Sequence, residues 1–154
     1  VDASSALSAG AVGVGLFRTE FLFMNRNGEL PGEEEQFQAY KAAVTAMQGL
    51  PVTIRTVDVG ADKPLDQLSA QELRHEHTLN PALGLRAIRW SLSEPEMFEE
   101  QLRAILRASA FGKLRILIPM VAHLSEVRAA LHALDLRRHR SRGHDRSAGC
   151  RHRN

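Results

Sequence analysis

Three arginines stand within or directly after apolar segments, where a charged side chain is unexpected. Arg55 interrupts the β-branched run 52–57, and a guanidinium that cannot be deprotonated needs an anion when it is buried. Arg18 directly follows another apolar run, and Arg86 lies inside a third. The arginine fork binds carboxylate or phosphate oxygens in pairs, so several converging arginines suit a small substrate with two or three negative charges. The residues themselves therefore predict a site for a phosphorylated carboxylic acid.

Acidic side chains near the same segments offer a simpler interpretation. Arg55 could form an internal salt bridge with Asp58, Asp62 or Glu20, and for each arginine taken singly this competes with ligand binding. Only the convergence of two or three arginines at one edge favours an anionic ligand. Whether they converge depends on the elements that position them.

The first half of the chain alternates between helix and strand patterns. Residues 3–9 are expected to end a helix that Gly10 closes, and 12–17 is typical of a buried strand. A second helix is expected from Pro31 to Gly49, because three glutamates in its first turn complement the helix dipole. The apolar face of that helix comprises Phe37, Tyr40, Val44 and Met47. Residues 52–57 form the next expected strand, followed by a long polar connection at 60–81.

The second half continues the alternation through one ambiguous segment. Residues 83–90 fit either a strand or a helix, and they precede a helix start marked by a capping box of Ser93 and Glu96. That helix is expected to run to about Ala110. It should bury Phe98, Leu102, Ile105 and Leu106. A strand at 114–121 and a helix at 125–136 follow, the latter with Val127, Leu131 and Leu134 inward.

This alternation predicts an α/β fold with a parallel sheet covered by helices. If 84–89 is a strand, four strand-helix units are present, with the other strands near 12–17, 52–57 and 115–121. Four such units are half of an eightfold TIM barrel, a partial (β/α)8 fold. Active sites of such barrels lie at the carboxyl ends of the strands, which is where Arg18, Arg55 and Arg86 are expected.

Length and composition fit one ordinary domain but conceal an uneven charge distribution. The 154 residues carry 20 Lys and Arg against 18 Asp and Glu, a formal charge of +2. Residues 137–154 hold seven of the arginines and one Asp, which leaves 13 basic and 17 acidic residues in 1–136. A single cysteine, Cys150, excludes an internal disulfide, and no apolar run is long enough to span a bilayer. A reducing, cytoplasmic setting is therefore expected.

The basic segment 137–154 lacks the apolar residues that a packed core needs, so it is expected to be disordered. Three readings stay open for it: a product of out-of-frame translation, a plain disordered terminus, and a basic arm for nucleic acid. The domain expectation is accordingly a barrel half at 1–136 and a separate tail at 137–154.

Four strings in the first 136 residues resemble the enzyme I family of the bacterial phosphotransferase system, the phosphoenolpyruvate-protein phosphotransferases. They are GVGLFRTEFLFM at 13–24, RTVDVGADK at 55–63, NPALGLRAIR at 80–89 and QLRAILRASAFGK at 101–113. The resemblance implies that Arg18 and Arg55 bind phosphoenolpyruvate and that Arg86 lies near its phosphoryl group. It further implies that Asp58 orients Arg55, with Glu20 and Asn80 as supporting partners.

Members of this family transfer the phosphoryl group of phosphoenolpyruvate to their own histidine and on to the carrier HPr, using Mg²⁺. The resemblance implies that this chain is a piece of such an enzyme, inactive alone, whose parent is a homodimer and serves sugar uptake. The phosphorylated histidine, the magnesium carboxylates and the catalytic cysteine of the family have no counterpart here. His75, His77, His123, His132 and the three tail histidines match no family motif, and neither does Cys150.

Two alternatives remain at this point. The chain could be a piece of the related pyruvate phosphate dikinase or phosphoenolpyruvate synthase. It could also be a non-catalytic binding module, pairing with a second copy through its open strand edges or holding nucleic acid with its basic tail.

Overall fold

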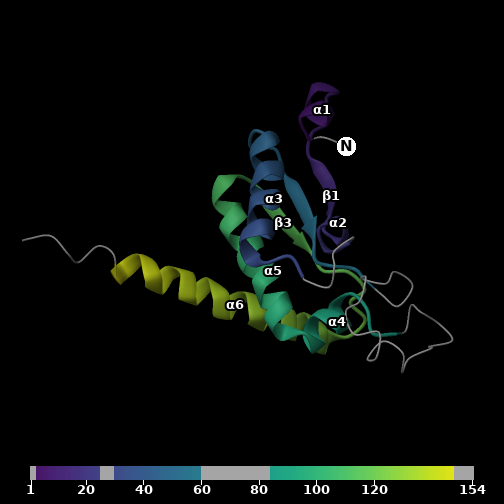
Figure 1. The fold of residues 1–154 in the computed structure, drawn as a ribbon, viewed down its shortest axis with the longest axis vertical. Coiled ribbons are helices and arrows are strands. Elements are labelled where there is room, and N and C mark those ends of the chain that lie inside the picture. The colour runs from purple at the N-terminus through teal and green to yellow at the C-terminus, as the bar shows by residue number, and fades with distance from the viewer. Residues whose placement is uncertain (1–2, 25–29, 60–83, 148–154) are drawn as a thin grey trace, which may run out of the picture.

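A computed structural model describes residues 3–24, 30–59 and 84–147, with the backbone alone for 136–147. In chain order the elements are α1 (Ala3–Ser8), β1 (Val14–Arg18), α2 (Glu20–Phe23), α3 (Glu33–Ala46), β2 (Val52–Arg55), α4 (Ile88–Ser93), α5 (Pro95–Ala108), the 3₁₀ helix η3 (Ser109–Phe111), β3 (Leu114–Leu117) and α6 (Leu124–Ser147). Figure 1 shows the strands packed beside α3 and α5, and α6 extending away from them. The expected α/β class is confirmed.

The three strands form one parallel sheet in the order β1-β2-β3. Arg18 of β1 stands opposite Arg55 of β2, and Arg55 stands opposite Leu117 of β3. Because the strands run the same way, the residues that follow each of them emerge at the same edge of the sheet. This edge is where the sequence places its arginines.

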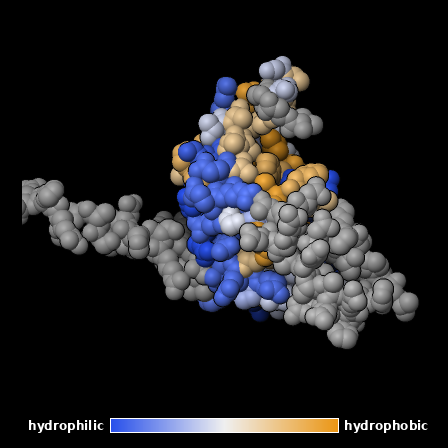
Figure 2. Space-filling model, in the orientation of Figure 1, coloured by the Kyte–Doolittle hydropathy of each residue, from blue (hydrophilic) through white to orange (hydrophobic). Residues whose placement is uncertain are grey.

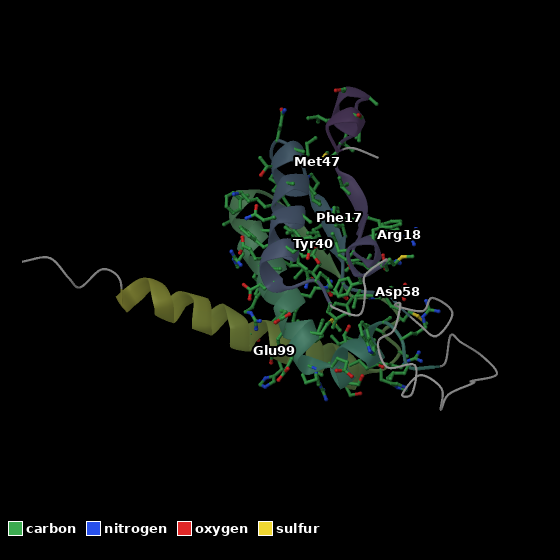
Figure 3. All side chains as sticks on the ribbon, viewed as in Figure 1. Phe17, Arg18, Tyr40, Met47, Asp58 and Glu99 are labelled. Carbon is green, nitrogen blue, oxygen red and sulfur yellow. The ribbon has the colours of Figure 1, made fainter. Side chains whose placement is uncertain are left out.

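Helices α3 and α5 cover one face of the sheet and enclose the main core. Val52 and Ile54 of β2 are fully buried against them, as are Tyr40 of α3 and Met47 directly after it, both labelled in Figure 3. Phe17 of β1 meets the Tyr40 ring edge to face, with the ring centroids 5.8 Å apart. The apolar face predicted for α3 is therefore confirmed.

The opposite face of the sheet is uncovered within the described part of the chain. Leu16 of β1 is 44% exposed and Leu117 of β3 is 38% exposed, whereas the residues that alternate with them pack on the core. In Figure 2 hydrophobic residues gather over β1, and hydrophilic residues cover α5 and the first turns of α3. The described sheet is open, so a barrel remains a prediction.

Of the two interpretations left open for the segment after residue 83, the strand at 84–89 is wrong. Ala87 has a φ of 51°, outside the β region, and helix α4 begins at Ile88. The Ala87 amide donates to the carbonyl of Val59, 3.3 Å away, in an irregular segment. Both sides of β2 are already paired with β1 and β3, so this segment has no place beside β2. The described residues thus contain three strands, and Arg86 lies in the turn before a helix.

Smaller departures concern helix ends. The capping box of Ser93 and Glu96 is absent, because the Ser93 hydroxyl donates to the Trp90 carbonyl and closes α4 instead. Helix α5 starts at Pro95, whose missing amide is tolerated in a first turn. Leu131, expected to face inward, is 54% exposed, and Ala130 takes the buried place on α6. Phe98, Leu102 and Ile105 are buried as predicted.

Helix α6 continues past residue 136 to Ser147, where the sequence predicts a disordered tail. Arginine is a good helix former, and extending an existing helix costs less than starting one, so the backbone continues the helix without needing a core. Residues 148–154 of the expected tail, with Cys150, lie outside the described residues. None of the helices in the described part is long and apolar enough to cross a membrane.

Candidate functional site

The carboxyl ends of β1 and β2 bring Arg18 and Arg55 to one edge of the sheet. The two arginines are direct partners in the parallel register. Arg55 is 18% exposed and Arg18 is 44% exposed, so one guanidinium is mostly buried and the other reaches solvent. The expected convergence of these two arginines is confirmed.

Glu20 supplies the first carboxylate of the site. It begins the short helix α2 directly after β1, and its side chain is only 2% exposed. Glu20 Oε1 lies 2.5 Å from Nη2 of Arg55, and Glu20 Oε2 lies 3.7 Å from Nε of Arg18. A buried carboxylate is costly without such partners, so Glu20 and Arg55 stabilise each other in place.

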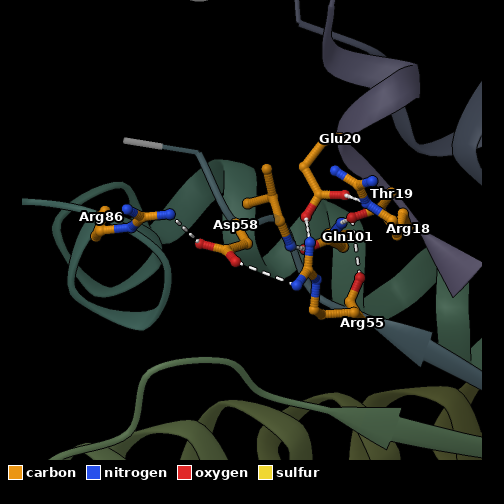
Figure 4. A network of polar contacts seen from close by, with 8 residues as sticks. Arg18, Thr19, Glu20, Arg55, Asp58, Arg86 and Gln101 are labelled. Atoms are coloured by element: carbon orange, nitrogen blue, oxygen red, sulfur yellow. Dashed lines mark hydrogen bonds and ion pairs between the residues drawn. The ribbon is translucent and has the colours of Figure 1, made fainter. Parts of the chain in front are cut away.

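Asp58 supplies the second carboxylate and links two distant parts of the chain. Its Oδ2 lies 3.2 Å from Nη1 of Arg55, and its Oδ1 lies 3.1 Å from Nη2 of Arg86. Arg86 is 19% exposed and reaches Asp58 from the turn before α4. Figure 4 shows the resulting row of alternating charges, from Arg86 through Asp58 and Arg55 to Glu20.

Five of the six predicted site residues therefore lie together, and the sixth, Asn80, lies outside the described residues, as does Asp62. The internal salt bridges that compete with ligand binding are real for Glu20 and Asp58. Among the described residues these salt bridges do not balance the arginines, because three guanidinium groups face two carboxylates there. The remaining positive charge, on forks held in fixed orientations, suits a phosphate or carboxylate ligand.

A chain of buried polar side chains behind the arginines was missed by sequence reasoning. Gln101 of α5 accepts a hydrogen bond from the Val57 amide at 3.0 Å and donates to Thr19 Oγ1 at 3.4 Å. Thr19 in turn donates to the carbonyl oxygen of Arg55 at 2.9 Å. Gln101 lies on the same helix face as the buried Phe98 and Ile105, so a polar residue on an apolar face was the available signal.

The chain continues from Gln101 into α3. Gln101 Nε2 also donates to the Tyr40 hydroxyl at 3.2 Å, and Tyr40 donates to Gln36 Oε1 at 2.9 Å. Burial raises the pKa of the Tyr40 phenol, so it remains a hydrogen-bond donor at all physiological pH values. Gln36 closes the chain by donating to the Pro31 carbonyl at 2.8 Å.

The described histidines stand apart from this site. His123 precedes α6 and His132 lies on it, both exposed. Arg89, a further arginine of the segment after residue 83, donates to the Gly84 carbonyl at 2.6 Å.

Among the described residues no three His, Cys, Asp or Glu side chains are grouped to hold a metal, and Glu20 and Asp58 face arginines instead. The described residues therefore do not fit the Mg²⁺ that the resemblance implies.

Known proteins of one name are similar to most of this chain. The phosphoenolpyruvate-protein phosphotransferase of Cupriavidus necator is 73% identical over 126 residues, which cover 82% of this chain and 21% of that protein. The proteins of the same name from Staphylococcus carnosus and Geobacillus stearothermophilus are 53% and 51% identical over 129 residues, or 84% of this chain. This chain spans about a fifth of the length of these curated relatives. Their names do not favour the dikinase, synthase or binding-module alternatives.

A family model described as the PEP-binding domain of PEP-utilising enzymes matches residues 1–146. That match covers nearly the whole chain and contains all of the arginines and carboxylates described above. The chain belongs to the family of phosphoenolpyruvate-utilising enzymes and corresponds to their phosphoenolpyruvate-binding domain.

Proposed function

We propose that this chain supplies the arginine-lined part of a phosphoenolpyruvate site in a phosphotransferase. The observation that carries the proposal is the row Arg86, Asp58, Arg55 and Glu20, flanked by Arg18, at the carboxyl edge of a parallel sheet. The relatives' names support the same ligand, since each is called a phosphoenolpyruvate-protein phosphotransferase.

The charges of the site match the chemistry of this ligand. Phosphoenolpyruvate carries a carboxylate and a phosphate, and guanidinium forks bind both kinds of oxygen in pairs. Arg18 is the most exposed of the three arginines and is the first to meet a ligand that arrives from solvent. Arg55 and Arg86 are already oriented by Asp58, so binding loses little further side-chain entropy.

In the proposed reaction the bond between phosphorus and the enol oxygen breaks and a bond from phosphorus to a histidine nitrogen forms. The enolate that leaves takes up a proton to become pyruvate. Phosphoryl transfer of this kind depends on positioning and charge stabilisation more than on covalent help from the protein. The three arginines would hold the phosphate and carboxylate oxygens while negative charge shifts toward the leaving enolate.

The wider setting of the proposal follows what the sequence resemblance implies. The parent enzyme would pass the phosphoryl group from its histidine to HPr for sugar uptake in the cytoplasm, with Mg²⁺ bound by residues outside the described ones, and it would act as a homodimer. The three described strands would belong to a TIM barrel whose remaining strands cover the exposed sheet face at Leu16 and Leu117. We place the barrel portion at 1–136 and treat 137–154 as a separate basic segment.

The binding part of this proposal can be tested on the chain itself by titrating phosphoenolpyruvate and following Kd by calorimetry. We expect saturable binding that weakens about tenfold or more in Arg55→Lys, because lysine cannot reproduce the paired contacts of the fork. Arg128→Lys, the same exchange at an exposed position of α6, is the control and should leave Kd unchanged. Equal affinity of both variants would contradict the assigned role of Arg55.

The inactivity of the chain alone requires a separate measurement. We expect no pyruvate from phosphoenolpyruvate, HPr and Mg²⁺ when this chain is the only enzyme present. Pyruvate release above the uncatalysed rate would overturn that part of the proposal and leave the binding site intact.

A further inference from the structure

Gln101 occupies an unusual position for a buried polar residue, because it contacts the segments that directly follow the two strands carrying Arg18 and Arg55. It is fully buried on α5, and its carboxamide oxygen and nitrogen bond to different segments of the chain. The carboxamide oxygen accepts from the amide of Val57, the residue directly before Asp58. The carboxamide nitrogen donates to Thr19, which stands between Arg18 and Glu20. One side chain therefore reaches the segment after β1 and the segment after β2.

The bond between Thr19 and the backbone of Arg55 closes a loop of contacts. Thr19 Oγ1 donates to the Arg55 carbonyl at 2.9 Å and accepts from Gln101 Nε2 at 3.4 Å. Val57 lies two residues after Arg55. The backbone is therefore held both at the Arg55 carbonyl, by Thr19, and at the Val57 amide, by Gln101. Figure 4 shows Gln101 and Thr19 beside Arg55.

Backbone position matters here because the β1–β2 ladder ends at this point. Arg18 and Arg55 are the last paired residues of their strands, so the ladder itself does not fix Thr19 or Val57 relative to each other. A buried amide that bonds to both replaces the missing ladder contacts. The spacing of the two arginines then depends on a residue that touches neither guanidinium.

We propose that Gln101 is a positioning residue for the phosphoenolpyruvate site: it sets the distance between Arg18 and Arg55 by tying Thr19 to Val57. This inference rests on the proposed function for its ligand, and on the described contacts for its geometry. A shift of about 1 Å in a binding group can change affinity or rate by large factors, so the loss of this link should be visible in ligand binding.

The test compares two identical exchanges in the full chain, Gln101→Met and Gln36→Met. Both glutamines are fully buried and hydrogen-bonded in the same polar chain, but Gln36 contacts Tyr40 and Pro31 rather than the strand ends. Both variants should lose thermal stability to a similar degree. Only Gln101→Met should weaken phosphoenolpyruvate binding, by about tenfold or more.

A second readout requires no ligand. We expect Gln101→Met, and not Gln36→Met, to shift the Nε–Hε NMR signal of Arg55 and to speed hydrogen exchange at the Val57 amide. Unchanged Arg55 and Val57 signals in Gln101→Met would overturn the inference, whatever the binding result. If the wild-type chain binds no phosphoenolpyruvate, the proposed function fails, and these signals still decide the role of Gln101.

A variant at Thr19 breaks the same link between Gln101 and Thr19. It tests the inference if Gln101→Met does not fold. Thr19→Val removes the hydroxyl that joins Gln101 to the Arg55 carbonyl, at constant side-chain shape. It should shift the same Arg55 signal. An Arg55 signal identical to that of the wild type would count against the inference.

Discussion

Glu20 Oε1 lies 2.5 Å from Nη2 of Arg55, and the two side chains are 2% and 18% exposed. A carboxylate this deeply buried is stable only with its partner, whereas the guanidinium has a second carboxylate, Asp58, within 3.2 Å. Glu20 therefore depends on Arg55 more than Arg55 depends on Glu20. Loss of Arg55 leaves Glu20 with only the more distant Arg18, and loss of Glu20 leaves Arg55 paired with Asp58.

This asymmetry predicts that Arg55→Met destabilises the chain more than Glu20→Gln does. We expect Arg55→Met to lower the free energy of unfolding by about 3 kcal/mol, the usual cost of stranding a buried charge. Glu20→Gln should cost about 1 kcal/mol, because the amide oxygen still accepts a hydrogen bond. Urea unfolding of the two single variants and the double variant measures both losses and their coupling. Strictly additive losses would show that the two side chains do not interact in solution.

Thr19 and Thr56 form a natural pair for testing a buried hydroxyl, because both are fully buried at the ends of neighbouring strands. Thr19 Oγ1 donates to the Arg55 carbonyl, whereas Thr56 Oγ1 finds no hydrogen-bond partner among the described residues. Thr19→Val should lower the free energy of unfolding by about 1–2 kcal/mol, because it leaves a buried acceptor unpaired. Thr56→Val removes an unsatisfied group and should be neutral or stabilising. Thermal unfolding of the two variants side by side decides the matter, and equal losses would speak against the hydrogen-bond assignment.

Glu33 links the first turn of α3 to α5 and gives the fold a pH dependence. Burial tends to raise the pKa of Glu33, but hydrogen bonds and charge from Arg103 and Arg107 outweigh it, so the pKa lies below its ordinary 4.5. Arg103 Nε lies 2.5 Å from Glu33 Oε2, and Arg107 Nη1 lies 2.9 Å from Oε1. A carboxyl whose pKa is lower in the folded state stabilises the fold above the unfolded pKa. That contribution disappears as the pH falls through the folded pKa.

Glu33→Gln should therefore lower the melting temperature at pH 7 and have progressively less effect as the pH falls below 4.5. Glu96→Gln is the matched control, because Glu96 occupies the first turn of α5 and makes no ion pair within the described residues. The measurement is a series of melting curves between pH 7 and pH 3. A destabilisation by Glu33→Gln that is equally large at both ends of the series would refute the ion-pair explanation.

The arginine site could be predicted from the sequence because charge inside an apolar strand is a strong local signal. Arg55 inside its β-branched run indicates a buried guanidinium that needs an anion, and the salt-bridge partners considered for it include the acidic Glu20 and Asp58. Parallel strands then bring Arg18 to Arg55 without any knowledge of side-chain geometry. Residue types and strand order together decide this part of the structure.

Other features depend on long-range contacts that no local pattern encodes. Residues 83–90 fit a strand as well as a helix, and only the direct pairing of β2 with β3 excludes a strand between them. The position of Gln101 on an apolar helix face signals a buried polar group, but it does not identify the partners Val57 and Thr19, which are far away in sequence. Ser93 fits a capping box by spacing, but the preceding helix α4 takes up its hydroxyl.

Gly13, directly before β1, and Gly15, within it, provide a test of how closely β1 packs against Pro51. A side chain at Gly13 would place its Cβ 2.7 Å from the carbonyl oxygen of Pro51, whereas a Cβ at Gly15 would meet nothing within 4 Å. The same Pro51 carbonyl accepts the Val14 amide at 2.8 Å, so the backbone of β1 and the residue before β2 approach closely here. Backbone cannot move aside as a flexible side chain does, so an added methyl group must push the two segments apart.

Gly13→Ala should therefore lower the free energy of unfolding by about 1–3 kcal/mol, the usual cost of forcing an extra carbon into a packed region. Gly15→Ala adds the same methyl group to the same strand in open space and should be neutral, or slightly stabilising through the unfolded chain. Because β1 carries Arg18 and Thr19 at its other end, the displacement in Gly13→Ala should also weaken phosphoenolpyruvate binding, and Gly15→Ala should not. Urea unfolding and calorimetric titration of the two variants test both statements. Comparable stability of the two variants would mean that β1 and the Pro51 segment are farther apart in solution than the 2.8 Å hydrogen bond between Val14 and Pro51 implies.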